Sequence, residues 1–220
     1  MTMQTPALAM ARRLALEQAW EAYRHGSFPV GAVILDPHGE VVAVGRNRVG
    51  EADAPEGRLR SSAIAHAEMD VLAQMPPGDY GAHTLVTSLE PCLLCRSAAT
   101  LSTLGNVDFI ASDLLWQGLD ALPTLNSQVA RRYPKMVGPQ LGKDADFASV
   151  LPLAVAIASG MKGTTAGDYA TRSPRAFAMA KHVVDTDAWP SREATLDDAM
   201  NHIADIADIA GSVSRLDDKS

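Results

Sequence analysis

The sequence predicts a layered α/β domain built on a mixed β-sheet. Segments with apolar residues at helical spacing alternate with short apolar runs rich in branched side chains, the pattern of strands interleaved with helices. The first two runs flank a tight turn and predict a hairpin, so at least one pair of strands is antiparallel. The chain has 220 residues, 47% hydrophobic and 20% charged, which suits one compact domain with an appended segment.

The N-terminal part is predicted to be a helix followed by the hairpin. Apolar residues recur at helical spacing over Pro6–His25, and Gly26 is a natural stop. The runs Pro29–Leu35 and Glu40–Gly45 then flank the turn signal Asp36–Gly39.

The remainder of the first half alternates helix and strand after a polar loop. In chain order we expect a loop over 47–60, a helix over 62–75, a strand over 83–88, a helix over 91–102 and a strand over 107–111.

The pattern weakens after Asp113. A buried helix is expected over 149–161, a loop over 162–175 because of its Gly, Thr and Ser, and a helix that begins near Leu196. We therefore predict one α/β domain over residues 5–145 and a mostly helical C-terminal extension over 146–220.

Composition and charge exclude several classes of protein. Lys and Arg number 19 against 26 Asp and Glu, and both halves of the chain are acidic, whereas an electrostatic nucleic-acid binder is usually basic. The two cysteines cannot build a disulfide framework. No export signal opens the chain, and the most apolar stretch, Phe147–Ser159, is too short to span a membrane, so we expect a cytoplasmic protein.

Three residues are candidate ligands of a zinc ion. His66 opens one predicted helix, while Cys92 and Cys95 open another, where the helix terminus favours the thiolate. Three protein ligands leave a fourth position for a water molecule, and zinc lowers the pKa of such a water to about 7. Glu68 lies two residues after His66, close enough to accept a proton from that water.

Other interpretations of these residues remain open. Cys92 and Cys95 could be a redox pair, the zinc could be structural with His83 or His25 as a distant fourth ligand, or the domain could be a non-catalytic interaction module. Trp116 is expected in the core, and Glu90 is expected to bond nearby backbone.

The order H-x-E and then P-C-x-x-C is the pattern of zinc nucleobase deaminases. It occurs here together with two further blocks, so that the set is Phe28–Val33, Gly45–Arg48, His66–Glu68 and Ser88–Cys95. With these blocks, the first half of the chain resembles the cytidine deaminase superfamily, and within it the branch of tRNA adenosine deaminases and guanine deaminases. The resemblance implies a three-layer α/β/α sandwich, a homodimer or larger assembly, and hydrolytic deamination that releases ammonia.

The resemblance also implies a role for each matching position. His66, Cys92 and Cys95 hold zinc, and Glu68 shuttles the proton. Substrate contacts are implied for Val30 as a pocket wall, Asn47 to the base or sugar, the backbone N–H of Ala67, and Asp113 after the fourth strand.

Two departures from the tRNA deaminases bear on the substrate. Asn47 and His66 enclose 18 residues where those enzymes have a short gap, and we expect this insertion at the pocket rim. No basic tail is evident, so a free nucleobase, nucleoside or nucleotide is favoured over tRNA, and Pro29–Ala32 looks like the purine-acting branch. The alternative, a tRNA adenosine deaminase, would need basic residues round the pocket, with Arg46, Arg48, Arg58, Arg60 and Arg96 as the candidates.

Overall fold

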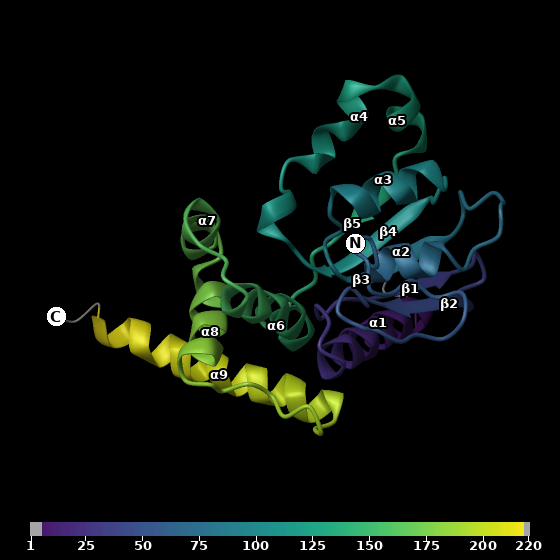
Figure 1. The fold of residues 1–220 in the computed structure, drawn as a ribbon. Helices are drawn as coiled ribbons and strands as arrows, with labels where there is room; N and C mark the ends of the chain where they lie inside the picture. The colour runs from purple at the N-terminus through teal and green to yellow at the C-terminus, as the bar shows by residue number, and fades with distance from the viewer. Residues whose placement is uncertain (1–5, 218–220) are drawn as a thin grey trace. The chain divides into compact units, whose positions relative to one another are not determined.

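A computed structural model describes residues 6–217 of the chain (Figure 1), with the side chains of residue 164 and residues 208–217 left out. The chain divides into two units, one up to Gln140 and one from Leu141 onward. Within the described residues, no helix is long and apolar enough to cross a membrane.

The first unit is built on a five-stranded mixed sheet, as the sequence predicts. The strands run in the order β2-β1-β3-β4-β5; β1 is antiparallel to both of its neighbours, whereas β3, β4 and β5 are parallel. The bounds are β1 Gly31–Leu35, β2 Val41–Arg46, β3 Thr84–Leu89, β4 Asn106–Ala111 and β5 Lys135–Val137.

Helices cover both faces of this sheet and give the predicted α/β/α sandwich. Helix α1 (Pro6–Arg24) packs on one face, and α2 (Ala67–Leu72) with α3 (Leu93–Leu101) on the other (Figure 1). Ala32 pairs with Gly45, so these two positions face the same side of the sheet, whereas position 31 faces the opposite side.

Two strand glycines permit the close approach of these helices. A Cβ at Gly31 would lie 2.1 Å from the carbonyl oxygen of Ala15 in α1, and one at Gly45 would lie 2.8 Å from Val71 Cγ1 in α2. The helix contributes small buried residues to this contact, since Ala15 and Ala19 are almost fully buried. Close packing of α1 on β1 therefore requires glycine at position 31.

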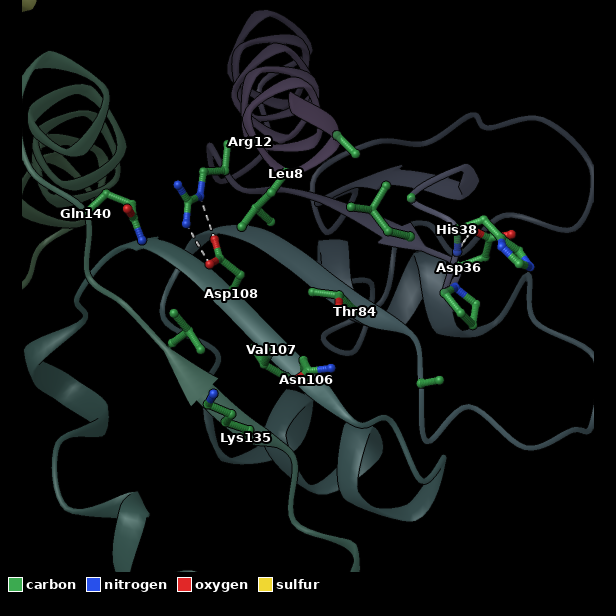
Figure 2. Close-up of a pocket in the computed structure, with 16 residues that line it drawn as sticks. Leu8, Arg12, Asp36, His38, Thr84, Asn106, Val107, Asp108, Lys135 and Gln140 are labelled. Carbon is green, nitrogen blue, oxygen red and sulfur yellow. Dashed lines mark hydrogen bonds and ion pairs between the residues drawn. The ribbon is translucent and has the colours of Figure 1, made fainter. Parts of the chain in front are cut away.

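A groove of about 510 Å³ lies beside α1 on its face of the sheet. Figure 2 shows Arg12 reaching from α1 to Asp108 on β4, with Asn106 and Lys135 along the same face. Two hydrogen bonds of 2.7 Å join the Arg12 guanidinium to both carboxylate oxygens of Asp108, and only 10% and 3% of these two side chains are exposed. This buried ion pair connects the N-terminal helix to strand β4.

The segment between β4 and β5 contains structure that the sequence pattern does not indicate. Strand β5 is only three residues long, and its pairing with β4 decides its conformation, because Asn106 lies opposite Lys135 in the parallel ladder. The helical turns before it are η1 Leu114–Trp116, η2 Leu119–Ala121, α4 Leu122–Leu125 and α5 Ser127–Arg132.

The second unit is helical, as predicted for the C-terminal extension. Its helices are α6 Lys143–Ala158, α7 Thr164–Arg172, α8 Pro174–Asp185 and α9 Leu196–Asp217. The expectation of a loop over 162–175 is wrong, because α7 forms there and packs against α8 despite Gly167. Packing of buried Tyr169 outweighs the weak helix propensity of Gly and Thr. The domain boundary between residues 145 and 146 stays a prediction.

Candidate active site

Three potential metal ligands converge between the N-termini of α2 and α3. Cys92 Sγ and Cys95 Sγ each lie 3.5 Å from His66 Nδ1, and the two sulfurs are 3.6 Å apart. A tetrahedral zinc with Zn–S of about 2.3 Å and Zn–N of about 2.0 Å sets its ligand atoms about 3.5–3.8 Å apart. The ligand atoms of His66, Cys92 and Cys95 therefore have the spacing that one zinc ion requires.

Local backbone conformation places these ligands. His66 and Cys92 are the N-cap residues of α2 and α3, both with extended backbone, and Cys95 follows in the first turn of α3. The two-residue gap brings the sulfurs of Cys92 and Cys95 to the same side of the helix start. Predicted helix 62–75 begins later than expected, because residues 62–65 form a turn before His66.

The three side chains influence one another's ionisation. The hydrogen bond with Cys95 and the bond with His66 lower the pKa of Cys92 to about 4, against the opposing effect of burial. The hydrogen bond with Cys92 and burial raise the pKa of Cys95, and the bond to Cys92 raises the pKa of His66. The site therefore already favours one thiolate, the form that a metal binds.

Glu68 lies beside the ligands on the same turn of α2. Its side chain is buried; Oε1 accepts a hydrogen bond of 3.1 Å from the Thr87 hydroxyl, and Oε2 lies 3.3 Å from Cys95 Sγ. Burial raises the pKa of the Glu68 carboxyl. The Thr87 hydroxyl on β3, which also lies 3.2 Å from the Leu89 carbonyl oxygen, is thus a hydrogen-bond partner of the Glu68 carboxyl. No sequence pattern indicates this contact.

A cavity of about 380 Å³ opens onto these groups. Such a volume lies in the range of small-molecule sites, and apolar walls with a few converging polar groups are typical of them. The lining residues are Phe28, Val30, Asn47, Val49, Ala63, His66, Glu68, Leu89, Glu90, Cys92, Asp113 and Trp116.

Three of the four predicted substrate-contact residues line this cavity. Asn47 Oδ1 accepts a hydrogen bond of 3.0 Å from Val49 N–H, which directs the amide nitrogen of Asn47 to other acceptors. Val30 lines the wall, and Asp113 lines it while its Oδ1 caps η1 by accepting from Leu115 N–H at 3.0 Å. The fourth, Ala67, is fully buried at the start of α2. Their substrate contacts stay predictions.

Trp116 is a cavity residue rather than the core residue expected from the sequence. It lies on η1 and is only partly buried, whereas an apolar core position would be enclosed. Glu90 also reaches the cavity, and it bonds backbone as expected, since its Oε2 accepts a hydrogen bond of 3.1 Å from Asp113 N–H. Its other oxygen pairs with the buried guanidinium of Arg96.

Arginines near the cavity were the candidates for binding the phosphates of a tRNA. Most of them form ion pairs with carboxylates inside the first unit. Arg46 forms a two-pronged pair with Glu51 at 3.0 and 2.8 Å. Further pairs join Arg48 to Asp70, Arg58 to Asp70, and Arg96 to Glu90 and Asp120, while Arg60 is exposed. Paired guanidinium groups offer little charge to a nucleic acid.

Comparisons with known proteins place this site in a family. The family model for the cytidine and deoxycytidylate deaminase zinc-binding region matches residues 7–111. A tRNA-specific adenosine deaminase of Aquifex aeolicus is 32% identical over 127 residues, which cover 55% of this chain and 81% of that protein. The chain belongs to the cytidine and deoxycytidylate deaminase family.

A second relative and one solved structure are also similar to this chain. A cytosine deaminase of Candida albicans is 31% identical over 127 residues, which cover 53% of this chain and 79% of that protein. The crystal structure of NE0047 in complex with 2,6-diaminopurine aligns with a TM-score of 0.51 at 20% identity, over 74% of this chain and 87% of that one, which supports the fold.

Proposed function

We propose that this member of the deaminase family is a zinc-dependent aminohydrolase of free nucleobases, nucleosides or nucleotides, with a purine-type base favoured. The oxygen of water would add to the ring carbon that carries an exocyclic amine, and the bond from this carbon to the protonated amine would then break, which releases ammonia and leaves a carbonyl. The observation that carries the proposal is the meeting of His66, Cys92 and Cys95 at zinc-ligand spacing beside buried Glu68. His66, Cys92 and Glu68 line one cavity, and Cys95 lies buried behind them.

His66 and the thiolates of Cys92 and Cys95 would hold the zinc ion. When bound, zinc supplies an acidified water as nucleophile near neutral pH. Glu68 would take a proton from that nucleophile with its carboxylate and deliver it to the departing amine nitrogen. The Thr87 hydroxyl would keep the Glu68 carboxylate turned toward the reacting atoms.

The cavity walls would orient the base. Phe28, Val30 and Trp116 offer flat or branched apolar surface to a ring, and the Asn47 amide nitrogen offers a donor to a ring or sugar acceptor. The backbone N–H of Ala67 is one of the first of its helix, where intrahelical acceptors are lacking, and would hold the base near the metal. Asp113 is a further proposed substrate contact.

A small substrate is favoured over tRNA by the charge around the cavity. The acidic balance of the chain and the internal pairing of Arg46, Arg48, Arg58 and Arg96 leave little free positive charge for phosphates. The second candidate function, tRNA adenosine deamination, is favoured by the 32% identity to a tRNA-specific adenosine deaminase. A homodimer and a cytoplasmic location stay predictions.

Ammonia release by the zinc-loaded protein tests the proposal. The panel would contain adenine, guanine, cytosine, their nucleosides and nucleotides, and an anticodon stem-loop, with a chelator-treated sample as blank. We expect release from one small substrate, with a purine favoured. Release from the stem-loop alone would instead establish the tRNA function, and salt would then weaken binding steeply.

A further inference from the structure

The long loop between β2 and α2 forms part of the cavity wall. Residues 47–66, all of them described by the structure, contain no helix or strand, and they contribute Val49 and Ala63 to the lining. A loop of this length without secondary structure is uncommon in a compact domain and usually belongs to a functional site. A flexible loop would make a poor wall, so its attachment to the domain matters.

The attachment centres on one buried carboxylate, that of Asp70. Arg58 approaches it with two nitrogens, Nε at 3.0 Å from Oδ1 and Nη2 at 2.7 Å from Oδ2. Arg48 Nη1 lies 2.5 Å from Oδ2, and the Leu59 N–H donates to Oδ1 at 3.3 Å. Only 1% of the Asp70 side chain is exposed, so these charge-assisted bonds are shielded from water.

The loop is also closed on itself around Arg48. The backbone N–H of Arg48 donates to the carbonyl oxygen of Ala65 at 2.9 Å, and the carbonyl oxygen of Arg48 accepts from the backbone N–H of Ser61 at 3.0 Å. Arg58 additionally donates to Val44 O on β2 at 2.5 Å. The start, middle and end of the loop therefore meet at the same place.

Asp70 lies on the side of α2 that faces away from the cavity. Successive residues of an α-helix are rotated by about 100°, so Asp70 is turned about 200° from Glu68, which lines the cavity. Neither Asp70 nor Arg58 lines the cavity. Any effect of this cluster on a substrate is therefore indirect, and it acts either through the loop or through α2, which carries Glu68.

We propose that Asp70, Arg48 and Arg58 form a clamp that fixes loop 47–66 as the wall of the substrate cavity and thereby determine the affinity for a small substrate. The inference rests on the proposed function. The exposed charged residues of the loop are Asp53, Glu56 and Arg60, which carry a net negative charge and do not favour phosphate. Val49 and Ala63, which the loop adds to the cavity wall, are apolar, so the wall suits the ring of a free base or nucleoside. Asp70, Arg48 and Arg58 are positioning residues, because none of them lines the cavity.

Arg58 is the residue through which the clamp can be tested, with Arg60 as the control on the same loop. Arg58→Ala should raise KM for the small substrate about tenfold and leave kcat within about twofold. A loosened cavity wall weakens the binding of the substrate and of the transition state equally, so the chemical step itself is unchanged. Amide hydrogen exchange over residues 49–63 should rise about tenfold in the same variant, with bound zinc unchanged. Arg58→Lys should recover only part of both, since lysine lacks the two-pronged geometry. Arg60→Ala, at an exposed position, should match the wild type.

Three results would overturn the proposal. The first is that Arg58→Ala and Arg60→Ala have the same KM and the same amide hydrogen exchange in the loop. Another is an equal loss of kcat and zinc, which would mean that Arg58 supports the helix carrying the ligands rather than the loop. The third is full recovery by Arg58→Lys, which would assign the effect to charge alone. If the wild type releases no ammonia from any small substrate, the proposed function fails, and loop exchange alone then decides for or against the clamp.

Discussion

The buried ion pair between Arg12 and Asp108 should contribute a large share of the stability of the first unit. Replacing Arg12 with Met removes both 2.7 Å hydrogen bonds and leaves the Asp108 carboxylate, 3% exposed, without its counter-charge. Removing one partner of a buried pair costs about 3–5 kcal/mol, because the remaining charge stays desolvated. Domains of ordinary stability have about 5–15 kcal/mol in total, so this loss is readily measured.

The neighbouring residue provides a matched control. Arg13 lies on the same helix and pairs with Glu17 at 3.2 Å, but these side chains are 40% and 46% exposed. An exposed pair of this kind contributes about 1 kcal/mol or less, so Arg13→Met should have a small effect. The double variant Arg12→Met with Asp108→Leu removes both charges and should regain most of the loss.

Hydrogen exchange of the amides in β1 and β3 is the appropriate assay. These strands lie at the centre of the sheet, where exchange requires unfolding of the first unit, so the exchange rates give its free energy of unfolding. A loss for Arg12→Met as small as that for Arg13→Met would refute the reasoning. So would a double variant no more stable than Arg12→Met.

Four further predictions concern the site and the packing. Zinc should raise the melting temperature by at least about 5 °C over the chelated protein in calorimetry, since it joins two helix termini; equal melting temperatures would contradict a metal site. Thr87→Val should lower kcat about tenfold at unchanged zinc content, because Glu68 loses its orienting hydrogen bond; unchanged kcat in steady-state assays would contradict that role. Gly31→Ala should destabilise the protein by at least about 2 kcal/mol in urea unfolding, because its Cβ would meet Ala15 O at 2.1 Å. Gly167→Ala, with open space around it in α7, should instead stabilise that helix by about 1 kcal/mol, and a loss there would argue against the helix.

The candidate zinc ligands could be found from the sequence because their chemistry is local. His66 and Glu68 share one helical turn, and Cys92 and Cys95 share another, so their spacing along the chain already determines how they lie. The hairpin, the parallel strands and the flanking helices likewise follow from apolar periodicity.

The features that sequence reasoning missed depend on tertiary contacts. Strand β5 has three residues and no periodicity of its own, and only the ladder to β4 makes it a strand. Thr87 contacts Glu68, which lies 19 positions away in the chain. Loop 47–66 is held by Asp70, and in the sequence an acidic residue at such a position is typical of the solvated face of a helix. Helix α7 forms because α8 provides a surface for it to pack on.

The most direct test of the account compares wild type with Glu68→Gln on the small substrate that releases most ammonia. Glutamine keeps the shape of the side chain but cannot take up the proton, and the two proteins should bind equal amounts of zinc. General acid–base catalysis contributes about 100- to 10,000-fold, so kcat should fall within that range. Zinc-loaded Glu68→Gln with the wild-type rate of ammonia release would contradict the central claim.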